Sequence, residues 1–311
     1  MARAAQEEPP RPEGLRACYL GRAGARRARN GEPSSRRRRR PPEEHVTGLD
    51  AASVRQAATD CAFIGGREAV VEFHPCLSST NDRLAELAAQ GAVEGSVVVA
   101  AQQDQGRGRL GRAWASPAGG IYLSLLLRPD AAMLRRLPAT LLGALAVAEA
   151  ISLCCDREAV LKWPNDVQLE GRKVAGILGE LTRDEAGHLL ILGIGVNLAI
   201  PEDSFPEELR ATACSIVSDP SQAPPPAEFL RALFARFEEH YLAVRRGGGV
   251  SILSAASARM PMLGKEVRIR LPERTVVGVA NGLNQTGGLV LEVDGRREVF
   301  VAGEVEEVRP Q

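Results

Sequence analysis

The sequence predicts an α/β protein followed by a small β-barrel, and three observations lead to this fold class. Between residues 48 and 245, helical apolar patterns alternate with short β-branched or leucine-rich runs, as in helices packed on a sheet. From about residue 260, short alternating runs are broken by Gly, Asn and Pro, which is typical of small barrels. The first 47 residues are rich in Arg and Pro and have almost no large apolar side chains. We therefore expect a tail at 1–47, a main domain at 48–259 and a barrel at 260–311.

Composition favours a soluble globular protein. The 311 residues include 39 basic and 39 acidic side chains, with 44% hydrophobic residues, which excludes coiled-coil, collagen-like and wholly disordered classes. No apolar stretch approaches 18 residues, so no membrane-spanning helix is expected. The six cysteines follow no metal-ligand spacing and are too sparse for a disulfide framework. Reduced thiols and a cytoplasmic location are the expectation.

The N-terminal tail is basic, whereas the rest of the chain is mildly acidic. Residues 1–45 contain 12 Arg and six Glu, including the run Arg36–Arg40. Such a segment cannot bury enough apolar surface to offset its ordering entropy, so we predict that it is disordered. An arginine run can be a nucleic-acid patch or a targeting signal. Early glutamates and the lack of an apolar signal core argue against targeting, and an unconstrained tail is favoured.

The elements follow from local patterns. The predicted helices are 50–59, with Asp50 as N-cap, then 81–89, the long apolar 137–154 and the amphipathic 227–245. The predicted strands of the main domain are 69–73, 96–101, 121–127, 159–163, 173–181 and 189–196, with a turn at 164–166. The predicted barrel strands are 266–271, 275–279, 288–293 and 298–301. Periodicity alone leaves the sheet open between mixed and doubly wound parallel.

A glycine and arginine loop at 106–112 is the first candidate for chemistry. Its three glycines let backbone approach a ligand closely, and its three arginines carry planar, permanently charged forks suited to phosphates and carboxylates. The spacing matches neither the P-loop nor the dinucleotide fingerprint. A flexible solvated turn in an Arg-rich protein is an equally open interpretation.

The second candidate is Lys162-Trp163-Pro164-Asn165-Asp166, at the end of an apolar strand. The chain has only three lysines and two tryptophans, and the other tryptophan, Trp114, follows the glycine loop. A compact ammonium can bind a point of developing negative charge. The alternative is a strand-ending turn with a partly buried Lys and a packed Trp.

A third candidate is Ser78-Ser79-Thr80-Asn81, which precedes a helical pattern. These residue types commonly cap helices. Hydroxyl and amide groups also donate and accept hydrogen bonds at once, as recognition of a polar heterocycle requires. The segment by itself does not decide between the two uses.

Together, and in this order, these segments resemble the bacterial biotin protein ligases, the biotin–[acetyl-CoA-carboxylase] ligase family. The resemblance spans about residues 70–309. The matching segments are Ser79-Thr80-Asn81, Gln103 with 106–112 and Trp114, Ser116-Pro117, 162–166, 173–178, 193–197 and 303–305. The pairing of the GRGRxGRxW and KWPND motifs is specific, whereas either motif alone is not.

The resemblance implies a fold and a reaction. The implied fold is a mixed, mostly antiparallel sheet flanked by helices, followed by a small SH3-like β-barrel. The implied reaction joins biotin to ATP, giving biotinyl-5′-AMP and pyrophosphate, and then transfers biotin to one lysine of a carboxyl carrier protein. ATP and Mg²⁺ are the implied co-substrate and ion, and the carrier belongs to a biotin-dependent carboxylase. Asp166 is expected to be structural.

The resemblance also implies site residues. The expected catalytic residues are Arg107, Arg109 and Lys162. The expected biotin-binding residues are Ser79, Thr80, Asn81, Gln103, Arg107, Gly108, Arg109 and Lys162. The expected ATP-binding residues are Gly106, Arg112, Lys173 and Asn197, and no metal-ligating residue is assigned.

Some members of the family carry an N-terminal DNA-binding domain and act as repressors. Residues 1–66 show no two-helix pattern with an intervening turn, so we expect the form without that domain, no specific DNA binding and no membrane association. The protein is expected to be a monomer or a homodimer. Two rival functions stay open: a lipoate ligase or lipoyl transferase, whose pocket should be long and apolar, and a noncatalytic sensor that binds nucleic acid through its arginine tail. A scaffold acting through the barrel alone leaves both motifs unexplained.

Overall fold

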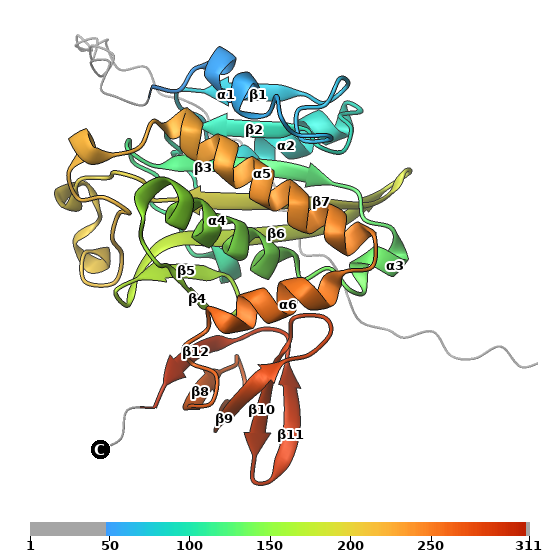
Figure 1. Cartoon of the computed structure of the whole chain (residues 1–311), viewed down its shortest axis with the longest axis vertical. Helices are drawn as coiled ribbons and strands as arrows, with labels where there is room; N and C mark the ends of the chain where they lie inside the picture. The colour runs from blue at the N-terminus through green and yellow to red at the C-terminus, as the bar shows by residue number, and fades with distance from the viewer. Residues whose placement is uncertain (1–47, 309–311) are drawn as a thin grey trace, which may run out of the picture. The chain divides into compact units, whose positions relative to one another are not determined.

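A seven-stranded mixed sheet forms the centre of the protein in this computed structural model, which describes residues 48–308 (Figure 1). Its strands, in spatial order, are β1 (Val71–His74), β2 (Val97–Ala100), β3 (Ile121–Leu127), β7 (Gly187–Val196), β6 (Arg172–Asp184), β5 (Asp166–Leu169) and β4 (Val160–Lys162). β1 and β2 are parallel, and every other neighbouring pair is antiparallel. The mostly antiparallel sheet confirms the expectation that the family resemblance supplied.

Helices cover both faces of this sheet. On one face lie α1 (Ala51–Ala57), α4 (Ala139–Cys155), α5 (Pro226–Arg245) and α6 (Gly249–Ala258), with the short α3 (Ala131–Leu134) near the sheet edge (Figure 1). On the other face, α2 (Thr80–Ala89) buries Leu84 against Val98 of β2. Because Val97 and Val99 point to the opposite core, β2 is buried on both sides and has no polar alternation. α2 covers only part of its face, and the polar residues described below lie beside it.

The C-terminal part is a second, smaller sheet. Five antiparallel strands are arranged in the order β11 (Arg296–Phe300), β10 (Leu289–Val293), β9 (Thr275–Leu283), β8 (Glu266–Arg270) and β12 (Glu304–Glu307). Trp163 joins this sheet to the main one, since its indole Nε1 donates to the carbonyl oxygen of Gly287 at 2.9 Å. The side chain of Trp163 is buried. The small terminal β domain expected from the sequence is thus docked on the body of the protein.

Most predicted elements are present, and a few were missed. Asp50 caps α1 as predicted, accepting from the Ser53 backbone N–H at 2.7 Å. Residues 164–166 were expected to be a single turn, but Asp166 begins β5, a four-residue strand too short to leave a clear pattern. α6 and β12 were not predicted, because α6 begins with glycine and serine and β12 is short and acidic. The tail predicted at 1–47 lies outside the described residues.

Within residues 48–308, no helix has both the length and the apolar character that crossing a membrane requires.

Candidate active site

A cavity of about 500 Å³ opens where the α2 side of the main sheet, the glycine loop and the C-terminal sheet meet. Eleven of the twelve predicted site residues line it: Ser79, Thr80, Asn81, Gln103, Arg107, Gly108, Arg109, Arg112, Lys162, Lys173 and Asn197. The twelfth, Gly106, supports the loop instead, because a Cβ there would lie 2.5 Å from the Trp114 carbonyl oxygen. The three motifs, far apart in the sequence, therefore converge on one site.

One end of the cavity is lined by hydroxyl and amide side chains. Ser79 is the N-cap of α2 and accepts from the Asp82 backbone N–H, so the capping interpretation of this segment is correct. The next residue, Thr80, donates from its backbone N–H to Gln103 Oε1 at 2.8 Å. Gln103 in turn donates through Nε2 to the Ser116 hydroxyl at 3.0 Å. These buried or half-buried hydroxyl and amide groups form a fixed array that can bind a neutral, hydrogen-bonding ligand.

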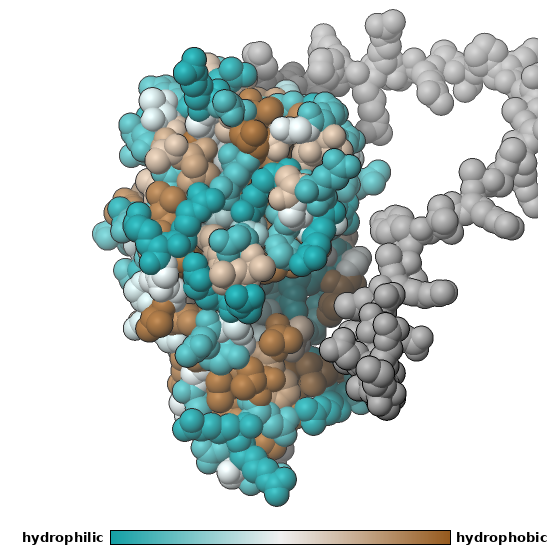
Figure 2. Space-filling model, turned by 90° about the vertical axis from the view of Figure 1, so that its right-hand side faces the viewer, coloured by the Kyte–Doolittle hydropathy of each residue, from teal (hydrophilic) through white to brown (hydrophobic). Residues whose placement is uncertain are grey.

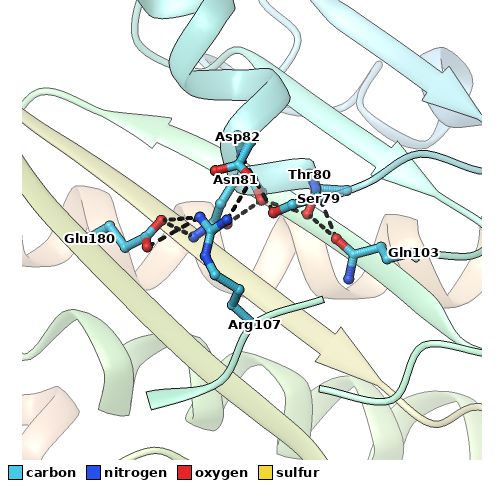
Figure 3. Close-up of polar contacts among 8 residues, drawn as sticks. Ser79, Thr80, Asn81, Asp82, Gln103, Arg107 and Glu180 are labelled. Atoms are coloured by element: carbon cyan, nitrogen blue, oxygen red, sulfur yellow. Dashed lines mark hydrogen bonds and ion pairs between the residues drawn. The ribbon is translucent and has the colours of Figure 1, made fainter. Parts of the chain in front are cut away.

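Asn81 is held from both sides at this end (Figure 3). Its Oδ1 accepts from the Ser124 hydroxyl at 2.5 Å, and its Nδ2 donates to Glu180 Oε2 at 2.6 Å. Only 5% of Asn81 is exposed. The two opposite contacts fix which end of the amide is the donor, so Asn81 presents a defined orientation to the cavity.

At three positions beneath the cavity the sheet carries glycine, so no side chains project from it there. Gly176 of β6 pairs with Gly195 of β7, and Gly193 lies on the same face two residues earlier. A Cβ on Gly195 would lie 2.5 Å from Trp114 Nε1, and one on Gly193 would lie 2.5 Å from Asn81 Oδ1. The glycines of the 173–178 and 193–197 segments therefore make room for the side chains that line the cavity.

Five basic side chains line the cavity, and three of them are neutralised by carboxylates of the protein. Arg107 pairs with Asp82 and Glu180, Lys173 with Asp166, and Arg112 with Glu304. Lys162 and Arg109 have no carboxylate within 4.0 Å among residues 48–308. These two cations are the ones available to an anionic ligand.

Arg109 is oriented by the second motif. Its Nη1 donates to Asn165 Oδ1 at 2.9 Å, and Asn165 Nδ2 donates to the Ile177 carbonyl oxygen at 3.1 Å. Burial lowers the pKa of Arg109, while the negative charges of Asp166 and Glu304 oppose that shift. An arginine guanidinium is effectively always protonated in proteins, so Arg109 can serve as a cation. The glycine loop and the 162–166 segment thus act as one unit, with Asn165 aiming the arginine.

Lys173 and Asn197 also line the cavity. Lys173 Nζ is 2.6 Å from Asp166 Oδ1 and 5.0 Å from the ring centroid of Trp114. Asn197 donates through Nδ2 to the Cys214 carbonyl oxygen at 3.1 Å, whereas its buried Oδ1 has no partner in the described part of the chain. Asp166, expected to be structural, is therefore the residue that holds Lys173 in place.

Several residues of the site were not singled out from the sequence. Glu304, at the start of β12, pairs with Arg112 across 192 positions of sequence, and residues 303–306 line the cavity. The segment around Phe205–Ala213 lines it as well. The family resemblance includes 303–305 only as part of the terminal barrel, and neither this glutamate nor the irregular loop carries a motif that marks a site residue.

Comparison with known proteins agrees with this geometry. The Biotin/lipoate A/B protein ligase family matches residues 73–197, and the Biotin protein ligase C terminal domain matches residues 262–306. The biotin–[acetyl-CoA-carboxylase] ligase of Paracoccus denitrificans is 36% identical over 231 residues, which cover 73% of this chain and 96% of that protein. The chain belongs to the biotin protein ligase family.

Other members of the biotin protein ligase family extend the comparison. The Bacillus subtilis protein described as bifunctional ligase/repressor BirA is 34% identical over 233 residues, covering 74% of this chain and 72% of that protein. The solved Aquifex aeolicus biotin protein ligase in complex with biotin and ATP aligns with a TM-score of 0.67 and 32% identity, covering 78% of this chain and 99% of that chain. The resemblance inferred from the motifs is thereby confirmed, as is the expected fold.

Proposed function

We propose that this protein is an ATP-dependent biotin protein ligase that forms biotinyl-5′-AMP with release of pyrophosphate and then transfers biotin to a lysine of a carrier protein. Family membership supports the activity. The observation that carries the assignment is that one cavity combines two cations without carboxylate partners in residues 48–308, Lys162 and Arg109, with the hydroxyl and amide groups around Asn81.

The chain's residues divide the work between the two ends of the cavity. Thr80, Asn81 and Gln103 bind the neutral ureido ring of biotin, which needs both donors and acceptors. Lys162 and Arg109 bind the biotin carboxylate and the α-phosphate, two anions that repel each other unless positive charge lies between them. Arg107 and Gly108 belong to the loop beside this ligand.

The chemistry needs no protein nucleophile. In the first step a carboxylate oxygen of biotin bonds to the α-phosphorus, and the bond from that phosphorus to the bridging oxygen breaks, releasing pyrophosphate. In the second step the carrier amine attacks the mixed anhydride carbonyl, AMP leaves, and the amine gives up a proton to solvent. Lys162 and Arg109 offset the charge that develops on the oxygens in both steps.

Lys173, Asn197 and Arg112 are proposed to contact the nucleotide, since they line the same cavity and lie outside the hydrogen-bonded group of Thr80, Asn81 and Gln103. Residues 48–308 contain no group of three His, Cys, Asp or Glu side chains arranged to bind a metal. Mg²⁺ prefers oxygen ligands and often keeps several waters while binding substrate phosphates. We propose that Mg²⁺ would arrive with ATP, and that Asp166, a carboxylate lining the cavity, could supply it with an oxygen ligand.

Biotin is favoured over lipoate by the hydroxyl and amide groups of Thr80, Asn81 and Gln103, because a lipoyl chain would desolvate their remaining donors and acceptors without bonding to them. The test is exchange of labelled pyrophosphate into ATP by the full chain with Mg²⁺, with biotin and with lipoate in parallel. Exchange with biotin alone supports the proposal. Exchange with lipoate alone, or with neither acid, contradicts it.

The partner, location and assembly complete the proposal. The carrier is the biotin carboxyl carrier protein of a biotin-dependent carboxylase, such as acetyl-CoA carboxylase, and the site of action is the cytoplasm. The protein works as a monomer or homodimer without specific DNA binding. Deleting residues 1–45 should leave exchange activity intact, whereas loss of all activity on deletion would favour the nucleic-acid-binding sensor.

Arg109→Gly is expected to release the adenylate roughly tenfold faster or more, because a charge-assisted hydrogen-bonding group is lost from the phosphate site. Stopped-flow measurement of biotinyl-5′-AMP release checks this. Arg109→Ala should match it, since the charge and not the added backbone freedom of glycine is responsible. Arg274→Gly, at an exposed barrel position paired with Glu298, is the control, and a wild-type release rate in both Arg109 variants would contradict the assignment.

A further inference from the structure

We propose that Glu180 is a positioning residue of the biotin pocket, which orients Asn81 and, together with Asp82, latches the glycine loop through Arg107. This inference rests on the proposed function for the identity of the ligand. It assigns Arg107 to loop closure, whereas the family resemblance assigns it to the ligand.

The first part of the argument is the double use of one carboxylate. Glu180 Oε2 accepts from Asn81 Nδ2 at 2.6 Å, and the same carboxylate lies 3.4 Å from Arg107 Nη2 through Oε1 (Figure 3). Asn81 is on α2, Arg107 is on the glycine loop and Glu180 is on β6. One side chain therefore links a pocket residue to the loop beside the pocket.

Asp82 completes the latch. Arg107 Nη1 donates to Asp82 Oδ2 at 2.5 Å, so the two ends of the guanidinium lie between carboxylates from α2 and β6 (Figure 3). Both carboxylates raise the pKa of Arg107. A guanidinium already shared by two carboxylates has less to offer a third anion, whereas Lys162 and Arg109 have no such partner within residues 48–308.

The ion pairs that form the latch are weak, because the side chains that make them are exposed to solvent. The side chains of Arg107, Asp82 and Glu180 are 38%, 48% and 42% exposed, and ion pairs of this kind contribute modestly and are weakened by salt. The contact between Glu180 and Asn81 is different, because Asn81 is buried and its Nδ2 would lose its acceptor. The ion pairs of Arg107 are therefore weak enough to break when the loop opens, whereas the hydrogen bond between Asn81 and Glu180 is expected to persist.

Two kinds of variant separate these contacts. Glu180→Gln keeps an oxygen that can accept from Asn81 but removes the charge facing Arg107, and Asp82→Asn removes the other charge without touching Asn81. Glu180→Ala removes both functions. Glu86→Gln, on the exposed side of α2 beside Arg83, is the matched control, and melting temperatures are measured for all four variants.

The first measurement needs no ligand. Hydrogen exchange of loop amides 106–113 in the full chain should be about fivefold faster in Glu180→Gln and Asp82→Asn than in the wild type or Glu86→Gln, because one exposed ion pair is lost. Raising the salt concentration should speed exchange in the wild type and have a smaller effect in the two variants, each of which keeps only one of the two ion pairs of Arg107. Equal exchange in all proteins would overturn the latch.

The second measurement uses biotin. We expect biotin to dissociate about fivefold faster from Glu180→Gln and Asp82→Asn, and about thirtyfold faster from Glu180→Ala, where the Asn81 amide also loses its partner. The kcat of pyrophosphate exchange at saturating biotin should stay within about twofold in the two charge variants. Parallel loss of kcat, affinity and melting temperature in Glu180→Gln would show a merely structural residue and overturn the assignment. The wild type could bind no biotin while hydrogen exchange of the loop amides still increases in the charge variants. That result would contradict the proposed function and support the latch.

Discussion

Lys162→Ala should reduce biotinyl-5′-AMP formation at least about a hundredfold while biotin still binds. The ammonium is one of two cations that face the cavity without a carboxylate partner in residues 48–308, so it is free to meet charge that develops as carboxylate and α-phosphate join. Loss of one preorganised charge contact at a transition state costs about 3 kcal/mol, or about a hundredfold in rate. The hydroxyl and amide groups proposed to bind the ureido ring are untouched by this change.

Pyrophosphate exchange gives the rate, and titration calorimetry gives the affinity for biotin. Lys162→Met keeps most of the apolar stem and should be equally impaired, which separates charge from packing. Lys265→Ala is the matched control, because Lys265 lies in the terminal β domain and pairs with the exposed Glu307. Wild-type pyrophosphate release from Lys162→Ala would remove the proposed role of this lysine.

The sequence revealed much of the site because its chemistry is carried by contiguous motifs. Ser79 and its neighbours, the 106–112 loop and the 162–166 turn are each short and ordered along the chain, and the structure brings them to one cavity. The strands that support them, such as β3 at Ile121–Leu127, are apolar enough to be located without a structure. The sheet type came only from resemblance, since alternating helices and strands fit two topologies.

What the sequence could not reveal are contacts between distant residues. Glu180 accepts a hydrogen bond from Asn81, 99 positions earlier in the sequence, and Arg112 forms an ion pair with Glu304 of the C-terminal sheet. The residues next to a carboxylate in a strand do not indicate its partner, because the tertiary structure determines which side chain lies beside it. The lack of a carboxylate partner for Lys162 within residues 48–308 is likewise a property of the assembled cavity, visible only once the carboxylates near the other cations are placed.

The glycines of β6 and β7 are the other feature that only the structure explains. In the sequence Gly176, Gly193 and Gly195 are part of strand patterns in which glycine is unfavourable. In the structure they face Trp114 and Asn81 at distances that leave no space for a methyl group. Poor strand residues at these positions are therefore an indication of a close approach by side chains of the site.

Gly193→Ala is expected to weaken biotin binding by at least about a hundredfold, even though Gly193 is not expected to touch biotin through a side chain. The new Cβ would lie 2.5 Å from Asn81 Oδ1, so the amide must move. It cannot move freely, because Ser124 and Glu180 hold it from either side. Displacing Asn81 therefore breaks two hydrogen bonds of a buried polar group, each contributing about 1–3 kcal/mol, and also misplaces the group that faces the ligand.

Gly179→Ala is the matched control for this substitution. Gly179 lies on β6, and a Cβ there would meet only Leu190, Leu192 and Thr140 at 3.6–3.9 Å, which is ordinary van der Waals contact. Both variants add one methyl group to the same sheet, so a general effect of alanine on the strands would lower biotin affinity in both. Calorimetric titration with biotin should instead show near wild-type affinity for Gly179→Ala and a large loss for Gly193→Ala. Equal affinities in the two variants would mean that the position of Asn81 does not control biotin binding.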